Sequence, residues 1–299
     1  MRLTCFRLLL LACLLQGARA FADEAALPPW LTERKVIGHN DLEPIEKSIG
    51  TPIYAESRGV ARVESVEEGL AFCTATRVGR DLFISNFHCY DFKPCPKVQF
   101  HLAYEQGLAH GEQLVVPCKN VLSKNLTYDY ALFQVETCGH VPSTSCLSLP
   151  GQLRPWSDAW SGSTAEDESG AAQQAPPDLA SFPIATLWNG PITVGQRVFA
   201  VGYPGARPKE VDRGPDCVLR TVVPQLLEER QTITHTCDTE GGSSGSPLMD
   251  VVTGFVVALH WGGTDKFNMA IPMSEIIADL KVQLAPEVFA QLQITDRVP

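Results

Sequence analysis

Short apolar runs separated by turn residues recur along the chain from residue 36 onward. Runs this short and this closely spaced are typical of an all-β sandwich or barrel. We therefore predict strands at residues 59–63, 71–78, 82–86, 98–103, 113–116, 130–135, 197–202 and 218–223. Near the C-terminus, Ile276, Ile277, Leu280 and Leu284 have the spacing of a short amphipathic helix, with Ser274 as its cap.

One segment breaks this pattern. Residues 150–183 are rich in small and polar residues and have little periodicity, which indicates an exposed linker or insertion. It divides the chain into two β-rich parts of comparable size, residues 36–149 and 184–299. We expect these to be two β domains, the second ending in the short helix.

The N-terminal residues have the features of an export signal. Arg2 and Arg7 precede an apolar run at 8–15 that is too short to span a bilayer, and a small-x-small site follows at 18–20. We predict a signal peptide at 1–20. A lipoprotein signal ending at Cys13 is the weaker alternative because the apolar run before it would be only five residues. Residues 21–35, which end in Glu-Arg-Lys, are read as a removable pro-segment.

Charge narrows the classes of partner. The formal net charge is −10, and loss of residues 1–20 removes three Arg and no acid, which changes it to −13. A general nucleic-acid binder would need a basic footprint, so we expect no nucleic-acid partner. No later segment is long and apolar enough to span a membrane. The expected protein is secreted, into the periplasm or the medium, and monomeric.

Eight cysteines remain after residue 20, an even number that indicates disulfides in an exported chain. No two of them form a Cys-x-x-Cys pair, so we expect no zinc site and no other metal. Cys73 and Cys89 flank two predicted strands, and a bridge between them would close a hairpin.

The strongest chemical signal is the run 241–247, Gly-Gly-Ser-Ser-Gly-Ser-Pro. Glycines beside a serine allow a tight turn that exposes a hydroxyl and lets backbone N–H groups converge on one point. Ser244 is the candidate nucleophile. The N–H groups of Gly242 and Ser244 are the candidate oxyanion hole, which would hold the negative oxygen of a tetrahedral intermediate.

A serine hydroxyl needs a base, and the base needs an orienting carboxylate. His88 ends an apolar strand next to Cys89, whose disulfide would fix its position. Asp129 begins the apolar run 130–135. The order His88, Asp129, Ser244, each in its local context, predicts a nucleophilic hydrolase.

With these motifs the chain resembles the chymotrypsin-like serine endopeptidases, and more closely their bacterial glutamyl-endopeptidase branch. The resemblance covers roughly residues 36–280, leaving 150–183 unmatched. It rests on the segments Val-Ile-Gly at 36–38, His-Cys at 88–89, Asp-Tyr-Ala-Leu at 129–132, Val-Gly-Tyr-Pro-Gly at 201–205, Gly-Ser-Ser-Gly-Ser-Pro at 242–247 and His-Trp-Gly-Gly at 260–263. Phe87 departs from the family, which usually has alanine there.

The resemblance implies two β-barrels with the site between them, and peptide hydrolysis through an acyl-enzyme without a cofactor. By proximity within this framework we favour three further disulfides, Cys95–Cys118, Cys138–Cys146 and Cys217–Cys237, among fifteen possible pairings. Maturation by cleavage after Lys35 is also implied, because in this branch a freed amine like that of Val36 helps to bind an acidic side chain.

Substrate preference depends on a few further positions. Thr239 and His260 match the positions that line the P1 pocket in glutamyl endopeptidases, and Trp261 and Gly262 match the strand that pairs with substrate backbone. Asp238 lies where trypsin-like relatives bind Arg or Lys. We expect cleavage after Glu or Asp. The alternatives are cleavage after Arg or Lys, or a catalytically silent peptide-binding homologue.

Overall fold

A closed six-stranded barrel forms the first β-structure of the computed structural model, which describes residues 34–108, 112–137 and 177–297. Its strands follow one another around the barrel in the order β3-β4-β5-β8-β7-β6. They span Val60–Ser65 (β3), Ala71–Arg77 (β4), Leu82–Ser85 (β5), Val98–Leu102 (β6), Leu114–Asn125 (β7) and Tyr130–Val135 (β8). Closure leaves no strand edge unpaired, which stabilises a barrel of such short strands.

Aromatic side chains fill this first barrel. The rings of Phe83 and Phe100 stack with their centres 5.0 Å apart, and Phe133 meets Phe100 edge-on at 5.4 Å. Every residue of β4 is buried because the strand is covered on both faces. The predicted strands at 71–78, 82–86 and 130–135 lie here within a residue or so, whereas β7 extends far beyond the predicted 113–116.

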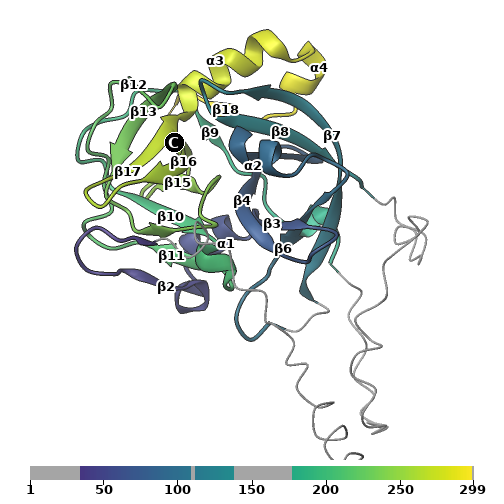
Figure 1. The fold of residues 1–299 in the computed structure, drawn as a ribbon, viewed down its shortest axis with the longest axis horizontal. Helices are drawn as coiled ribbons and strands as arrows, with labels where there is room; N and C mark the ends of the chain where they lie inside the picture. The colour runs from purple at the N-terminus through teal and green to yellow at the C-terminus, as the bar shows by residue number, and fades with distance from the viewer. Residues whose placement is uncertain (1–33, 109–111, 138–176, 298–299) are drawn as a thin grey trace, which may run out of the picture.

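A ten-stranded sheet forms the second β-structure, with the core order β12-β13-β17-β16-β15-β10-β11-β2. Figure 1 shows it beside the first barrel, mostly in green and yellow, with β2 in purple. Its strands span Leu42–Pro44 (β2), Leu187–Trp188 (β9), Val198–Gly202 (β10), Glu210–Asp212 (β11), Gln225–Leu227 (β12), Arg230–His235 (β13), Pro247–Asp250 (β15), Val256–Gly263 (β16), Asn268–Pro272 (β17) and Ile294–Thr295 (β18). The chain therefore has the all-β, two-barrel chymotrypsin-like architecture that the sequence predicts.

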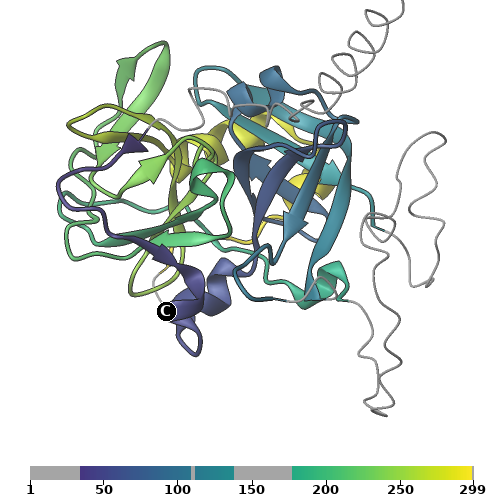
Figure 2. The same cartoon turned by 60° about the horizontal axis from the view of Figure 1, so that its bottom comes forward.

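The N-terminal segment belongs to the second β-structure, not to the first. β2 pairs with β11, and β1 (Arg34–Lys35) pairs with β14 (Thr239–Glu240). Figure 2 shows this purple segment running along the green part of the molecule. The assignment of residues from 36 onward to the first domain is thus wrong for this segment, because pairing with distant strands decides its place.

Three further expectations differ from the structure. Residues 218–223 form only isolated bridges at Val218 and Leu219, not a strand. Helix α3 (Met273–Gln283) begins after Pro272, and the Ser274 side chain does not cap it. Phe182 is buried in the first barrel's core although residues 150–183 were expected to be exposed. The rest of that segment as far as residue 176 lies outside the described residues, as do residues 1–33.

The buried face of α3 is the predicted one. Ile276, Ile277 and Leu280 are buried, and the helix packs against β16 and β17. Short helices complete the described chain: the 3-10 turns Ile45–Ser48, Leu179–Ser181 and Pro204–Ala206, and the α-helices α1 (Pro52–Ser57), α2 (Phe87–Phe92) and α4 (Pro286–Phe289). None of the described helices is long and apolar enough to cross a membrane.

Three of the predicted disulfides are formed, Cys73–Cys89, Cys95–Cys118 and Cys217–Cys237. The first two lie in the first barrel and the third braces the approach to the serine loop. Cys138 and Cys146 lie outside the described residues.

Candidate active site

Helix α2 presents His88 at the end of strand β5. The strand ends at Ser85, and the helix begins two residues later at Phe87. The Cys73–Cys89 disulfide joins the first turn of α2 to β4. The His88 side chain is 35% exposed, so the ring is reachable from solvent while its backbone is fixed on both sides.

Asp129 lies against His88 and is fully buried. One carboxylate oxygen is 2.9 Å from His88 Nδ1, and the other accepts the His88 backbone N–H at 3.1 Å. Asn86 Nδ2 donates to the Asp129 carbonyl at 2.8 Å and so holds the backbone of the aspartate as well. Because an ionised carboxylate only accepts, His88 Nδ1 carries the proton and Nε2 is left as an acceptor in the neutral ring.

The serine loop is built on glycines with positive φ. Gly242 has φ +93° and Gly245 has φ +86°, a conformation that side chains with a Cβ rarely adopt. A Cβ on Gly245 would also lie 2.0 Å from the Thr74 carbonyl oxygen. Glycine is therefore required at 245 both by backbone conformation and by the close approach of strand β4.

Thr74 of β4 ties this loop to the first barrel. Its Oγ1 donates to the Gly242 carbonyl at 2.9 Å, and its backbone N–H donates to the Ser244 carbonyl at 2.8 Å. Since Thr74 follows Cys73, and Cys73 is bonded to the neighbour of His88, these contacts bring the loop and the histidine into one region. The three candidate catalytic residues come from α2, the residue before β8 and the β14–β15 loop, and hydrogen bonds join the first two.

The backbone N–H groups of Gly242 and Ser244 donate to no acceptor within the described residues. Neighbouring amides of the same loop are used: Ser243 N–H donates to the Glu240 carbonyl and Gly245 N–H to the His260 carbonyl. The two free donors are those that the sequence assigns to the oxyanion hole. A bound carbonyl oxygen could therefore take up both N–H groups without breaking a bond.

The Ser244 hydroxyl lies 3.4 Å from the Trp261 carbonyl oxygen and forms no hydrogen bond to His88. Bonds between catalytic groups are often long in a free enzyme and shorten when substrate binds. A rotation about χ1 redirects the hydroxyl without any change of backbone.

His260 lies against a second histidine, His235, which no sequence motif marks. His260 Nδ1 is 3.1 Å from His235 Nε2, and both rings are buried. Thr239 Oγ1 is buried and has no hydrogen-bond partner. Burial, helped by the nearby His88, lowers the pKa of His260 to about 3, and burial also lowers the pKa of His235. Both imidazoles are thus neutral at pH 7.

Asp238 faces the N-terminal segment. Its two oxygens accept the backbone N–H groups of Ile37 and Asp41, each at 2.7 Å, and its side chain is buried. Burial raises its pKa, although these two bonds oppose the shift. Both oxygens are already used, so Asp238 is placed differently from a carboxylate that waits for a basic substrate.

The residues just before Val36 lie next to Thr239. Lys35 is the register partner of Thr239 in the β1–β14 pair, and its carbonyl accepts from Asn268 Nδ2 at 2.8 Å. In the chain described here Val36 is an internal residue, so its nitrogen is an amide. A cut after Lys35 would create its ammonium next to the register partner of Thr239.

Trp261 and Gly262 lie on β16, where the register with β17 shifts. Trp261 Nε1 donates to Thr232 Oγ1 at 3.3 Å, which holds the indole against β13. Arg230 is a further charged residue at the site, with its Nε 3.0 Å from Asp129 Oδ2. No local motif marks this arginine, since it reaches the aspartate from the other β-structure.

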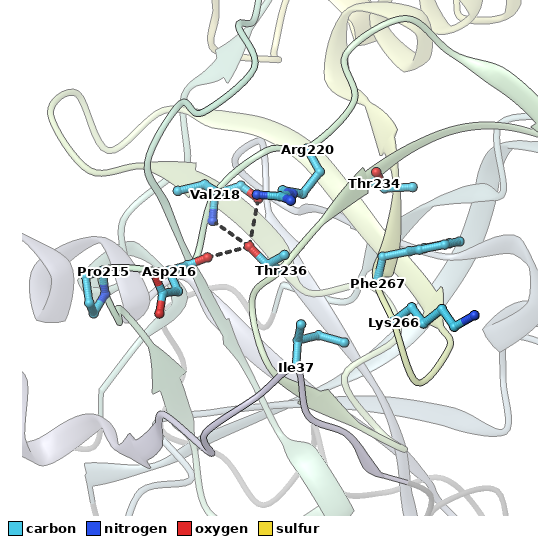
Figure 3. A pocket seen from close by; sticks show the side chains of 9 residues that line it. All are labelled: Ile37, Pro215, Asp216, Val218, Arg220, Thr234, Thr236, Lys266 and Phe267. Carbon is cyan, nitrogen blue, oxygen red and sulfur yellow. Dashed lines mark hydrogen bonds between the residues drawn. The ribbon is translucent and has the colours of Figure 1, made fainter.

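Figure 3 shows a hollow of about 460 Å³ whose lining includes none of the three candidate catalytic residues. It is lined by residues of the second β-structure together with Ile37, and Thr236 Oγ1 donates to backbone carbonyls at its floor. The His/Cys/Asp clusters that are compact enough for a metal, among the residues described, all include cysteines of the Cys73–Cys89 or Cys217–Cys237 disulfides, whose sulfurs are not free thiolates.

Comparison with known proteins decides the family. A family model described as the trypsin-like peptidase domain matches residues 73–259, more than half of the chain. The chain belongs to the trypsin-like peptidase family. It is a hydrolase of the serine endopeptidase class.

Solved structures agree with the fold of this trypsin-like peptidase. A Glu endopeptidase in complex with MPD is 14% identical, with a TM-score of 0.55 over 86% of this chain and all of the other. The inactive form of the Rv3671c protease is 17% identical, with a TM-score of 0.50 over 78% of this chain and 92% of the other. A mutant of Rv3671c from M. tuberculosis H37Rv is similar at 16% identity and a TM-score of 0.50. No curated protein matches the chain significantly.

Proposed function

We propose that this peptidase is secreted and cleaves peptide bonds after Glu or Asp, with His88, Asp129 and Ser244 as its catalytic residues. Two hydrogen bonds support these roles most directly: the Asp129 carboxylate accepts one from the ring Nδ1 and one from the backbone N–H of His88. These bonds hold the proton on Nδ1 and leave Nε2 as an acceptor, in a side chain that is 35% exposed. The next residue, Cys89, is bonded to Cys73, which precedes the Thr74 that contacts the serine loop.

The proposed reaction follows from these roles. His88 Nε2 takes the Ser244 proton while Oγ attacks the peptide carbonyl carbon, and Asp129 stabilises the imidazolium. The N–H groups of Gly242 and Ser244 hold the oxyanion. The imidazolium then protonates the leaving amine, the C–N bond breaks, and water releases the acyl group by the same route.

Preference for an acidic residue is supported by the chemistry of Thr239 and His260. Thr239 offers a buried hydroxyl without a partner, and the neutral His260 can donate one hydrogen bond. The positive charge would come from the Val36 amine after cleavage beyond Lys35, because Lys35 is the register partner of Thr239. Cleavage after Arg or Lys is disfavoured because Asp238 already accepts two backbone N–H groups.

Secretion is supported by the signal-like residues 1–20 and by the disulfides, which persist in oxidising compartments. N-terminal sequencing of the exported protein tests both processing steps. A start at Val36 is expected for the active form. A stable, fully active form that starts at Phe21 would contradict the proposed role of the Val36 amine.

The experiment for specificity uses three peptides that differ only at P1, with Glu, Gln or Arg, and protein that starts at Val36. We expect kcat/KM to be highest for Glu and to fall by about two orders of magnitude for Gln, which retains the shape and loses the charge. Ser244→Ala is the control for contaminating peptidases. Faster cleavage after Arg than after Glu would contradict the acidic preference but not the catalytic assignment.

A further inference from the structure

Arg230 brings a positive charge from the second β-structure onto the buried carboxylate of Asp129. Its Nε is 3.0 Å from Asp129 Oδ2, the same oxygen that lies 2.9 Å from His88 Nδ1. The contact is an ion pair without the in-line N–H···O alignment of a hydrogen bond. Asp129 is fully buried and Arg230 is 16% exposed, so little water screens the interaction.

The arginine is fixed in this position by its surroundings. Its guanidinium carbon lies 4.6 Å from the centre of the Trp261 ring, and Nη1 donates to the Glu228 carbonyl at 3.0 Å. The next residue, Gln231, donates its N–H to the Thr127 carbonyl at 3.0 Å. The β12–β13 hairpin is therefore attached to the loop that carries Asp129.

The turn of this hairpin is unusual in its residues. Glu228 and Glu229 have φ of +46° and +66°. Two successive positive φ values are typical of a turn that favours Asn and Gly, and glutamate adopts them at a cost in free energy. The hairpin nevertheless keeps the geometry that directs Arg230 across to the first barrel.

We propose that Arg230 is a positioning residue that orients the Asp129 carboxylate and limits how readily His88 takes up a proton. The proposal rests on the proposed catalytic role of the His88–Asp129 pair. A cation that shares the oxygen bound to His88 opposes a second positive charge on the imidazole. Arg230 therefore keeps His88 neutral, and able to act as a base, at lower pH.

Other groups that face the pair do not supply this charge. His260 of β16 is close, but burial lowers its pKa to about 3, so it is neutral where the enzyme works. Lys124 at the end of β7 is exposed, and its Nζ lies 5.8 Å from the ring of Phe87, beside His88. Arg230 is the cation in direct contact with Asp129 in the described structure.

The test replaces the arginine by two neutral residues, Arg230→Gln and Arg230→Met, the second of which retains an apolar stem against Trp261. Arg230→Lys keeps the charge, and Arg220→Gln, whose side chain lines the hollow of Figure 3, is the matched control. The acid limb of kcat/KM against pH is measured on chains that start at Val36. The protonation of His88 is followed by NMR in the Ser244→Ala background, which needs no hydrolysis.

In the neutral variants we expect the midpoint of the acid limb of kcat/KM and the midpoint of the His88 NMR titration each to rise by about half to one pH unit. We also expect kcat to fall by a larger factor than KM changes. Arg230→Lys should lie near the parent and Arg220→Gln should match it. A His88 midpoint that stays within about 0.2 pH units of the parent in whichever neutral variant folds would overturn the proposal. If the unmutated enzyme hydrolyses no peptide while the His88 midpoint still rises, the proposed function fails and the role of Arg230 stands.

Discussion

The hydroxyl of Thr74, on a strand of the first barrel, donates to the carbonyl of Gly242 in the serine loop of the second β-structure at 2.9 Å. The same hydroxyl accepts a hydrogen bond from the backbone N–H of Tyr203 at 3.1 Å, and Tyr203 directly follows strand β10. One side chain thus joins the loop that carries the proposed oxyanion donors to the barrel that carries His88.

Replacing Thr74 by valine removes both bonds while keeping the shape of the side chain. We expect a loss of about 1–3 kcal/mol in the free energy of unfolding, since a buried donor and acceptor lose their partner. We also expect a fall in kcat, because the Gly242 peptide is no longer held in place. Urea unfolding and kcat measurements check this, with Thr74→Ser as the control that retains the hydroxyl. A valine variant with the parent's stability and kcat would contradict the role given to this contact.

Gly245→Ala should prevent the serine loop from forming. The added Cβ would meet the Thr74 carbonyl oxygen at 2.0 Å, in a residue whose φ is already +86°. Gly69→Ala is the matched control, because Gly69 also has a positive φ of +64° but an added Cβ there would meet no atom within 4 Å. We expect the control to lose about 1 kcal/mol and the Gly245 variant to lose several. Thermal unfolding of the two variants measures these losses of stability. Equal losses in the two variants would contradict the role given to crowding at residue 245.

A buried ion pair between the two β-structures provides a third prediction. Lys209 Nζ is 3.0 Å from Glu105 Oε1, both side chains are fully buried, and Tyr54 donates its hydroxyl to the same carboxylate. Lys209→Met leaves the Glu105 charge without its partner and should cost about 3–5 kcal/mol in the free energy of unfolding. The double variant Lys209→Met/Glu105→Gln should recover most of this loss, which a double-mutant cycle measures. Additive losses would show that the two residues do not interact.

The buried histidine pair predicts how stability changes with pH. Burial lowers the pKa of His260 to about 3 and also lowers that of His235, so the folded protein leaves both neutral where the unfolded chain binds protons. The free energy of unfolding should therefore fall as pH drops below about 6.5, by up to about 1.4 kcal/mol per pH unit for each histidine. Burial raises the pKa of Asp212 to about 6, so this carboxyl binds its proton more readily in the folded state. Its contribution to the free energy of unfolding therefore increases as pH falls.

The variant His235→Gln/His260→Gln isolates the histidine contribution, because Asp212 is present in both proteins and cancels in the difference. Its stability should vary less with pH than the parent's between about pH 7 and 4, as measured by urea unfolding at each pH. Parallel curves for the two proteins would contradict the neutral buried state of the pair.

Much of this site could be predicted because its signals are local. The glycine-serine run, the histidine beside a cysteine and the aspartate before an apolar strand each mark a backbone turn or a strand end, and the structure has such a feature at Ser244, His88 and Asp129. The strand at 130–135 was predicted with its observed ends because nearly all of it is buried.

The parts that were missed depend on contacts between distant residues. Arg230 and His235 lie on β13, whose sequence Arg-Gln-Thr-Ile-Thr-His is mostly polar and gives no sign that its side chains face Asp129 and His260. Residues 42–44 join the second β-structure only through β11. The failed cap at Ser274 has a local cause, since the helix begins directly after Pro272 and places that serine inside its first turn.

In the proposed mechanism Ser244 is a nucleophile activated by His88 and Asp129. The most direct measurement is labelling of the folded protein that starts at Val36 with a serine-directed phosphonate, followed by mapping of the modified residue by mass spectrometry. We expect a single label on Ser244, none on Ser244→Ala, and labelling slowed by about four orders of magnitude or more in His88→Ala. A folded protein that takes no label, or takes it on another residue, would contradict the account.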